Sequence, residues 1–191
     1  MALKKGYAAQ HCSLARTLEL VGERWTMLVV RDAFYGVRRF SDFQAHLDVP
    51  RAVLSARLGT LTEAGILEKR RYEQAPPRDE YVLTERGRQL WPALYALLAW
   101  GEAHASGSRP VRRYFLHQAC GCRLDPAGGC PECGLGTVPP GDIEVHPGPG
   151  ADHPDRQDPV SRAMLRPHRL LEPLDTVPTG SGAAEQQRNS R

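Results

Sequence analysis

One stretch of this 191-residue chain, from Arg24 to Leu90, constrains the fold more than any other part. Apolar residues first recur at helical spacing between Arg24 and Phe34. Gly36 should end that helix, because glycine takes the left-handed conformation of a helix C-cap at little cost. Ser41 then offers a favourable N-cap for a second, shorter helix. Two short helices in close succession are therefore predicted at the start of this stretch.

A third helix is predicted from Pro50 to Ala64, because proline suits a first helical turn and Leu54, Leu58 and Leu61 form one apolar stripe. Gly65 should end it. A strand is expected at 66–72, and a returning strand at 81–83.

Pro76-Pro77 marks the turn between those strands, since proline cannot continue a ladder of hydrogen bonds. Thr84-Glu85 has the composition of a helix start, and Pro92 should kink that last helix or delay its start. Three helices followed by a hairpin and a further helix predict a mainly α fold with a small β wing, the winged helix-turn-helix. The work typical of this fold is to place one helix in a DNA major groove.

The same stretch resembles the HxlR family of bacterial winged-helix transcription regulators, which are relatives of the MarR family. The matching residues are Cys12, Arg24-Trp25-Thr26, Arg39-Phe40, Leu54-Ser55-Ala56-Arg57-Leu58, Leu61, Gly65-Ile66-Leu67, Pro76-Pro77-Arg78, Glu80-Tyr81, Leu83-Thr84, Gly87, Leu90 and Trp100-Gly101. The resemblance covers about residues 8–104. The chain departs from the family at Cys12-Ser13, where the family commonly has Cys-Pro. The common family domain also lacks everything that follows about Ser106. The resemblance implies a regulator that binds an operator as a homodimer and responds to a small molecule or an oxidant.

Charge is distributed unevenly along the chain. Residues 1–118 hold 18 Lys and Arg against 12 Asp and Glu, whereas residues 119–191 hold 7 against 10. A basic first part is consistent with a polyanionic partner such as double-stranded DNA. We expect a winged helix-turn-helix domain for DNA binding and dimerisation at 8–106, a small zinc ribbon at 111–140, and a Pro- and Gly-rich, disordered tail at 141–191.

The candidate DNA contacts lie on the third helix, just before the second, and in the wing. They are Arg38, Arg39, Arg51, Ala52, Ser55, Ala56, Arg57 and Arg78. Small residues near the start of a recognition helix allow close approach to base edges, whereas arginines at its sides more often touch phosphate. For each arginine taken alone, a solvated surface charge is the competing interpretation.

A further helix is expected after Cys12, ahead of the three helices above, and large apolar residues are numerous in it and in the last helix. Trp25, Leu28, Phe40 and Leu67 are expected in the core, with a ligand box as an alternative role for Trp25. Other apolar side chains of the two terminal helices exceed what a monomer of about 100 residues can bury. They are Tyr7, Leu14, Leu18, Leu90, Leu94, Leu97, Leu98 and Trp100. A helix-on-helix homodimer would cover them and place two recognition helices about one DNA turn apart.

Two half-motifs with matched spacing follow the last helix: His117-x2-Cys120-Gly and Cys130-x2-Cys133-Gly. The glycine after each pair can take the positive φ of a tight knuckle, in which backbone N–H groups point at sulfur. Four nitrogen and sulfur ligands match tetrahedral Zn²⁺ in a closed, structural site. Cys122 could replace His117 as the fourth ligand, and free cysteines are the competing interpretation. The segment resembles the zinc ribbons appended to some proteins of this family.

Cys12 is the remaining cysteine and precedes a predicted helix, where the helix N-terminus would favour its thiolate. In some relatives, cysteines at this position sense oxidants or electrophiles, so the resemblance permits a redox switch. The alternative is an ordinary packed cysteine. An odd cysteine count argues against a disulfide framework.

Membrane and enzyme functions find no support in the sequence. We find no apolar run of membrane-spanning length and no signal-peptide core, so a cytoplasmic protein without a membrane partner is expected. There is no Gly-rich phosphate loop, metalloprotease pattern or carboxylate pair, so no enzyme is expected. The alternative to a DNA-binding regulator is a zinc-ribbon adaptor for protein interactions that lacks sequence-specific DNA binding.

Overall fold

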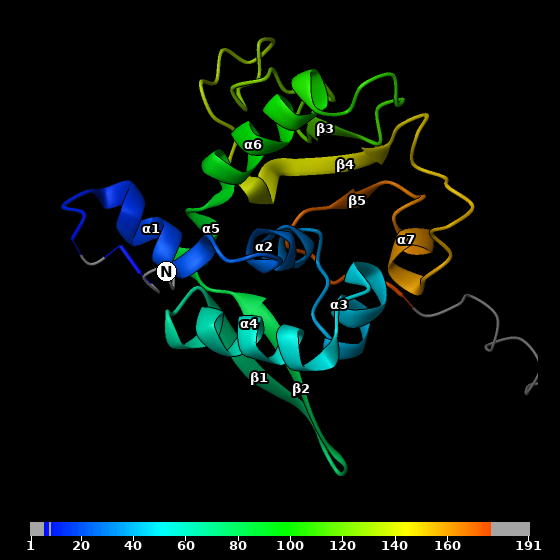
Figure 1. Cartoon of the computed structure of the whole chain (residues 1–191). Coiled ribbons are helices and arrows are strands. Elements are labelled where there is room, and N and C mark those ends of the chain that lie inside the picture. The colour runs from blue at the N-terminus through cyan, green and yellow to red at the C-terminus, as the bar shows by residue number, and fades with distance from the viewer. Residues whose placement is uncertain (1–5, 8, 177–191) are drawn as a thin grey trace, which may run out of the picture.

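A computed structural model describes residues 6, 7 and 9–176 of the chain. Its first part contains α1 (Ser13–Val21), α2 (Thr26–Phe34), α3 (Phe40–Leu47), α4 (Arg51–Glu63), β1 (Leu67–Gln74), β2 (Pro77–Leu83), α5 (Glu85–Arg88) and α6 (Trp91–His104). Its second part contains β3 (Arg113–His117), the 3-10 helix η1 (Pro140–Asp142), β4 (Ile143–Pro147), α7 (Pro159–Ala163) and β5 (His168–Arg169). The fold is a winged helix-turn-helix with a second, three-stranded sheet beside it (Figure 1).

The helix-turn-helix unit forms where the sequence predicts it. Gly36 has φ +87° directly after α2, in the left-handed region that favours glycine. The turn between α3 and α4 uses the left-handed Asp48 and then Pro50, which is the N-cap of α4. The start of α3 differs from the prediction: it begins at Phe40 with Arg39 as N-cap, so Ser41 lies inside the helix rather than capping it.

The wing is longer than predicted. β1 and β2 pair antiparallel from Leu67 opposite Leu83 to Gln74 opposite Pro77. Pro77 therefore belongs to the returning strand instead of standing only in the turn. It is tolerated there because the end of a hairpin needs no further ladder hydrogen bond from its nitrogen.

The last helix is split, as Thr84 and Pro92 predict. The Thr84 hydroxyl accepts a hydrogen bond from the Gly87 N–H at 3.0 Å and so caps α5. A new helix, α6, then starts at Trp91 with proline in its first turn. A Cβ on Gly87 would lie 2.2 Å from the Ile66 carbonyl oxygen, so the chain crosses the base of the wing at this glycine.

The segment expected to be a disordered tail from residue 141 is folded as far as residue 176, which corrects that prediction for its described part. β3 pairs antiparallel with β4, and β4 with β5, so one sheet crosses the boundary predicted at residue 140. Side chains of this segment complete the core of the winged helix. They are Ile143, Val145, Val160, Met164 and Leu170, buried in one cluster with Phe34, Trp91, Tyr95 and Phe115 of β3. Residues 177–191 of the predicted tail lie outside the described residues.

Backbone hydrogen bonds attach the end of this segment to the α2–α3 turn. The Leu171 N–H donates to the Phe34 carbonyl at 2.8 Å, and the Leu174 N–H donates to the Gly36 carbonyl at 3.0 Å. The Glu172 carbonyl oxygen lies only 1.8 Å from where a Cβ on Gly36 would stand. We call residues 170–176 the C-terminal strap. It packs directly on the helix-turn-helix unit.

Several large apolar side chains remain exposed on the helices α1, α2 and α6. They include Leu14, Leu18, Leu28, Leu97 and Trp100. The prediction of Leu28 as a core residue is wrong, because its side chain is 39% exposed. Trp25 and Phe40 are half-buried against the core, and Leu67 is buried as expected. None of the helices in the described part of the chain has the length and apolarity to span a membrane.

Candidate nucleic-acid interface and metal centre

Helix α4 has one buried face and one exposed face. Leu54, Leu58 and Leu61 are fully buried beneath it. The residues between them point outward because a helix turns by about 100° per residue. The exposed residues in its first turns are Arg51, Ala52, Ser55 and Ala56. The N-terminal half of α4 therefore presents a shallow surface of small side chains with one arginine at its edge.

The two arginines of α4 differ in what holds them. The Arg51 guanidinium lies over the Phe40 ring at 4.9 Å from its centroid and remains exposed. Arg57 is half-buried and forms an ion pair with Glu23 at 3.4 Å. Arg51 is thus free to reach a ligand in front of α4, whereas Arg57 is already directed toward the α1–α2 loop.

Arg38 and Arg39 precede α3 and also differ. The Arg38 guanidinium donates to the Leu171 carbonyl at 3.0 Å and lies 3.7 Å from the Glu80 carboxylate. Arg39 is exposed and lies over the Tyr72 ring at 5.4 Å. Arg38 therefore links the C-terminal strap to the wing, and Arg39 is the one of the two that faces outward.

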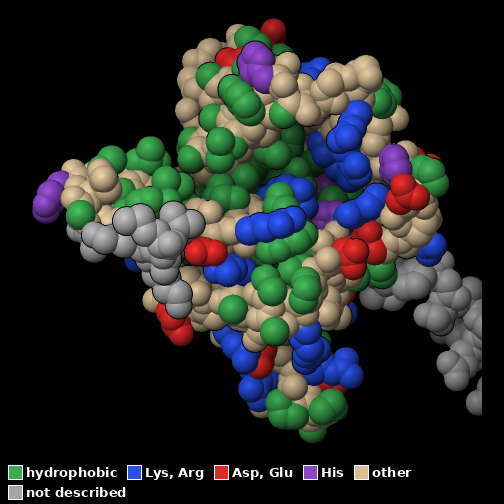
Figure 2. All heavy atoms as spheres, viewed as in Figure 1, with side chains coloured by type: hydrophobic (Ala, Val, Ile, Leu, Met, Phe, Trp, Pro, Cys, Tyr) green, Lys and Arg blue, Asp and Glu red, His purple; other side chains and the backbone are tan. Residues whose placement is uncertain are grey.

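The wing carries more basic side chains than the predicted contact Arg78. Arg78 is exposed near the turn and pairs with Glu73 at 3.1 Å. Lys69, Arg70 and Arg71 on β1 are also exposed, and Asp79 accepts from Arg71 at 2.5 Å and from Lys69 at 3.0 Å. Figure 2 shows Lys and Arg side chains along the wing above its apolar tip. The run Lys-Arg-Arg on a predicted strand was the available signal for them.

A buried polar network anchors α3 to α2. Asp32 is fully buried and accepts hydrogen bonds from Arg31 at 2.7 and 2.9 Å, while its other oxygen contacts His46 Nδ1 at 2.7 Å. Arg156 donates to the His46 carbonyl at 2.5 Å. Burial opposes ionisation of Asp32, but Arg31 and His46 outweigh it and hold the pKa of that carboxyl below its ordinary value. This network was not predicted from the sequence, because its members come from three distant segments.

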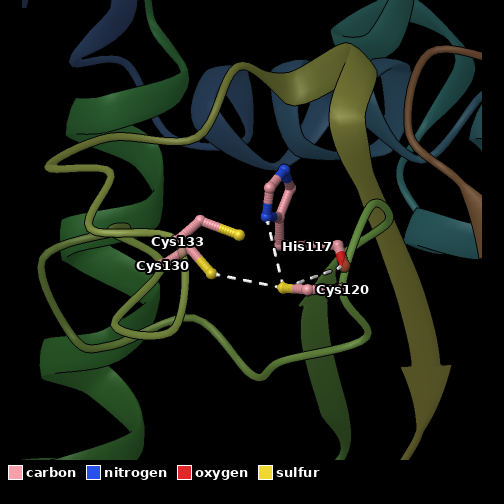
Figure 3. Close-up of side chains that lie close together, drawn as sticks. All are labelled: His117, Cys120, Cys130 and Cys133. Atoms are coloured by element: carbon pink, nitrogen blue, oxygen red, sulfur yellow. Dashed lines mark hydrogen bonds between the residues drawn. The ribbon is translucent and has the colours of Figure 1, made fainter.

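Four side chains converge beyond the end of β3. The ligand atoms of His117, Cys120, Cys130 and Cys133 all lie within 4.8 Å of one another. Figure 3 shows these side chains pointing toward one another beside α6. Cys122 is not part of this group, and its thiol is directed to the Arg123 carbonyl at 3.6 Å. These four residues could hold a metal ion, and they are the set that the matched spacing favours.

The backbone of both knuckles suits sulfur ligands. Gly121 and Gly134, which follow the two motifs, have φ +71° and +66°. The Cys122 N–H donates to the Cys120 sulfur at 3.4 Å, as expected of a turn whose N–H groups face a thiolate. In the second knuckle, Cys130 and Leu135 exchange backbone hydrogen bonds at 2.8 and 3.1 Å. The glycines therefore have the conformations predicted for them.

The sulfurs of the cluster do not ionise alike. Burial disfavours the Cys130 thiolate, but hydrogen bonds from the Cys133 backbone, Cys120 and His117 lower the pKa of Cys130 to about 6. The Cys133 thiol donates to Cys120 and Cys130, and this bonding, with burial, raises the pKa of Cys133 to about 12. Cysteines bind a metal ion as thiolates, so metal binding at this cluster would release protons.

Cys12 is the N-cap residue of α1 and is exposed, and its side chain makes no capping hydrogen bond. It lies at the helix start, as predicted. Exposure argues against the packed-cysteine interpretation and leaves its thiol accessible to solvent.

Comparison with known proteins places this architecture among regulators. A family model described as HxlR-like helix-turn-helix matches residues 20–109. The uncharacterized HTH-type transcriptional regulator Rv3095 of Mycobacterium tuberculosis is 41% identical over 138 residues, covering 72% of this chain and 87% of that protein. The uncharacterized HTH-type regulator YdeP of Bacillus subtilis is 31% identical over 94 residues, covering 49% and 73%. The crystal structure of PA1607, a candidate transcription factor, matches at TM-score 0.54 and 36% identity, covering 61% of this chain and 81% of that chain.

Proposed function

The chain belongs to the HxlR-like helix-turn-helix family of transcriptional regulators, and we propose that two copies of it bind a pseudo-palindromic operator. Each copy would place α4 in the major groove and the β1–β2 wing against the adjacent backbone. The observation that carries this proposal is the exposed N-terminal half of α4, where small side chains stand beside Arg51.

The contacts divide by what each side chain can reach. Arg51, Ala52, Ser55 and Ala56 would face base edges, because the N-terminal residues of a recognition helix do so. Arg39 and Arg78 would contact phosphates from the start of α3 and from the wing. Arg57 would do the same if it exchanged its ion pair with Glu23 for a phosphate. Arg38 would act chiefly by holding the wing against the C-terminal strap.

A homodimer is supported by the apolar side chains left exposed on α1 and α6. The exposed fractions are 64% for Leu14, 59% for Leu97 and 61% for Trp100. Pairing of these helices between two copies would remove that surface from water. It would also hold two α4 helices at a fixed separation, which a palindromic site requires.

The Cys and His cluster would hold one structural Zn²⁺ per chain. A nitrogen and three sulfurs suit its preference for tetrahedral coordination, and a closed set of four ligands leaves no position for a reacting water. The ion would cross-link the loop 117–138 and would have a structural role, not a catalytic one. Cys122 is the alternative fourth ligand, and its position outside the cluster makes it the weaker candidate.

Regulation by an oxidant would act through Cys12. Its exposure and its place at the N-terminus of α1 support reaction of the thiolate, and α1 belongs to the proposed dimer surface. Oxidant should then change operator affinity of the native chain but not of Cys12→Ser. Equal responses of the two proteins would reject this role.

A titration of the full chain with DNA from its own promoter region tests the proposed function. Affinity should fall steeply with salt, because phosphate contacts release counterions. Arg78→Ala should weaken binding to all sequences, and Arg51→Ala should also reduce preference for the operator, by about 1–3 kcal/mol if its base contact is bidentate. Arg162→Ala, an exposed arginine on α7, is the control.

Unchanged binding by both Arg51→Ala and Arg78→Ala, or affinity independent of salt, would contradict DNA reading by α4 and the wing. Absence of operator binding with an intact metal site would instead favour the adaptor interpretation, in which the loop 117–138 contacts another protein.

A further inference from the structure

A cleft of about 980 Å³ lies between the winged helix and the segment that follows it. Residues of α2 and α6 line one side, and residues 109–126 line the other. The lining is completed by His46 of α3 and by Arg156 and Met164, which come from the part of the chain after β4. The exposed face of α4 and the wing take no part in it. Figure 2 shows basic side chains gathered beside the hollow between the two parts of the molecule.

The lining combines apolar rings with positive charge. Its large apolar members include Trp25, Tyr35, Tyr95, Leu98, Phe115 and Met164. Its basic members include Arg31, Arg109, Arg112, Arg113, Arg123 and Arg156. Of the residues that the structure describes, Glu102 supplies the one carboxylate in the lining. This lining differs from an ordinary surface groove, because it contains many aromatic rings. It also differs from an apolar core, because it contains six arginines.

Most of this positive charge forms no ion pair with a carboxylate in the described part of the chain. Arg31 is paired with Asp32, and Arg156 lies 3.7 Å from Asp158. Among the described residues, no carboxylate forms an ion pair with the other four arginines of the lining. They are Arg109, Arg112, Arg113 and Arg123.

Arg113 is the clearest case of an uncompensated cation. Its side chain is half-buried at the start of β3, and burial, followed by the charges of Arg112 and Arg31, lowers the pKa of its guanidinium. Its guanidinium donates a hydrogen bond to a neutral group, the Arg112 carbonyl, at 2.8 Å. An anion placed here would gain charge-assisted hydrogen bonds and relieve repulsion between like charges.

We propose that this cleft binds an amphipathic organic anion, with a flat apolar body between the aromatic side chains and a carboxylate at Arg112 and Arg113. The volume is that of a site for a small organic molecule. A small inorganic anion would leave the aromatic walls in contact with water, and a nucleic acid is too large for the cleft. The arginine fork is suited to bidentate contact with a carboxylate.

The site goes beyond the proposed DNA-binding function. The HxlR-like match ends at residue 109, whereas Arg112, Arg113 and Arg123 lie beyond it. The segment that follows the family domain would therefore contribute the arginines that hold the carboxylate, while α2 and α6 of the family domain supply much of the apolar wall. Its binding can be measured without DNA, so its failure and that of operator binding are distinguishable.

Isothermal titration of the full chain with 2-naphthoate, 2-naphthamide and acetate tests the proposal. Naphthoate should bind at least about tenfold more tightly than the neutral amide, since a hydrogen bond to a charged group contributes that much. Acetate, which lacks the apolar body, should show no measurable binding. Arg113→Gln should weaken naphthoate binding by about tenfold, and Arg166→Gln, an exposed arginine elsewhere, should leave it unchanged.

A second variant tests the apolar body separately from the charge. Ala99→Phe fills part of the cleft from α6 and should weaken naphthoate and naphthamide alike. Unchanged far-ultraviolet circular dichroism of each variant would establish that it is folded. Equal affinity for naphthoate and naphthamide, equal affinity in Arg113→Gln and Arg166→Gln, or no binding of naphthoate would overturn the proposal.

Discussion

The winged helix and the loop 117–138 are stabilised by different means. The winged helix buries large apolar side chains from α2, α3, α4 and α6, among them Phe34, Leu54 and Trp91. The loop buries Leu124, Cys130 and Val138 and little else that is apolar. So few buried groups cannot offset the conformational entropy of ordering more than twenty residues. We therefore expect the loop to depend on a metal ion held by its four ligands, whereas the sheet β3–β4–β5 depends on packing against the winged helix.

The largest effect is expected from removing a metal ligand. Cys130→Ser should abolish stoichiometric zinc, because binding energies of structural zinc sites are on the order of 10 kcal/mol and depend on the full ligand set. Elemental analysis of protein prepared without chelator measures this. His117→Ala should lower affinity far more than Cys122→Ser, which serves as the matched control.

The reverse ranking of His117→Ala and Cys122→Ser would move the site to four cysteines. Absence of zinc from the native chain would reject a metal-stabilised loop altogether.

The next largest effect is expected inside the winged helix. Asp32→Asn should lower the free energy of unfolding by roughly 3–5 kcal/mol, because it leaves Arg31 without its buried partner. Since the pKa of Asp32 is lower in the folded protein than its ordinary value of 3.8, its contribution is complete above that value. The contribution is lost as pH falls through the lower, folded value. Urea titrations of native and variant protein at several pH values measure the difference.

A difference between the two proteins that grew on acidification would contradict this assignment of the carboxylate.

A smaller effect is expected where the C-terminal segment meets the winged helix. Met164 is fully buried in the shared core. Met164→Ala should therefore lower the free energy of unfolding in the main transition by about 2–3 kcal/mol. Leu165→Ala removes a similar volume from a side chain that is 38% exposed and should cost much less. Loss of stability confined to a separate, earlier transition would show that this segment folds independently.

The smallest effect is expected at the C-terminal strap. Gly36→Ala would place a non-glycine residue at φ +87°, a backbone conformation that costs about 1–2 kcal/mol of conformational free energy. Its Cβ would also displace the Glu172 carbonyl. Hydrogen exchange of the Leu171 and Leu174 amides should become faster while the zinc content stays at one per chain. Unchanged protection of both amides would contradict the docking of the strap on this turn.

The sequence predicts the winged helix well because its signals are local. The stripe of Leu54, Leu58 and Leu61, the glycines that end the helices and the cap at Thr84 each act within a few residues of themselves. The four-residue cluster was also within reach, since the matched spacing of two ligands and a glycine sets each knuckle by local geometry.

The folded C-terminal segment could not be predicted in the same way. Val160, Met164 and Leu170 are too few among prolines and glycines to form a core alone. They fold because the winged helix, whose α3 packs against α7, supplies the apolar surface that buries them. The partners of Arg38 and Asp32 were hidden for the same reason, because they come from segments distant in sequence. Leu28 was misassigned because an apolar residue at helical spacing can face a partner copy or a cleft as well as the core.

Hydrogen exchange of the full chain with and without a zinc chelator tests the contrast between loop and core most directly. Chelation should remove protection from loop amides such as those of Gly121, Cys130 and Leu135. Amides of α4 and of the β3–β4 ladder should keep theirs, because apolar packing on α2 and α6 holds them. Loss of protection throughout α4 on chelation, or undiminished protection of the loop, would contradict the account.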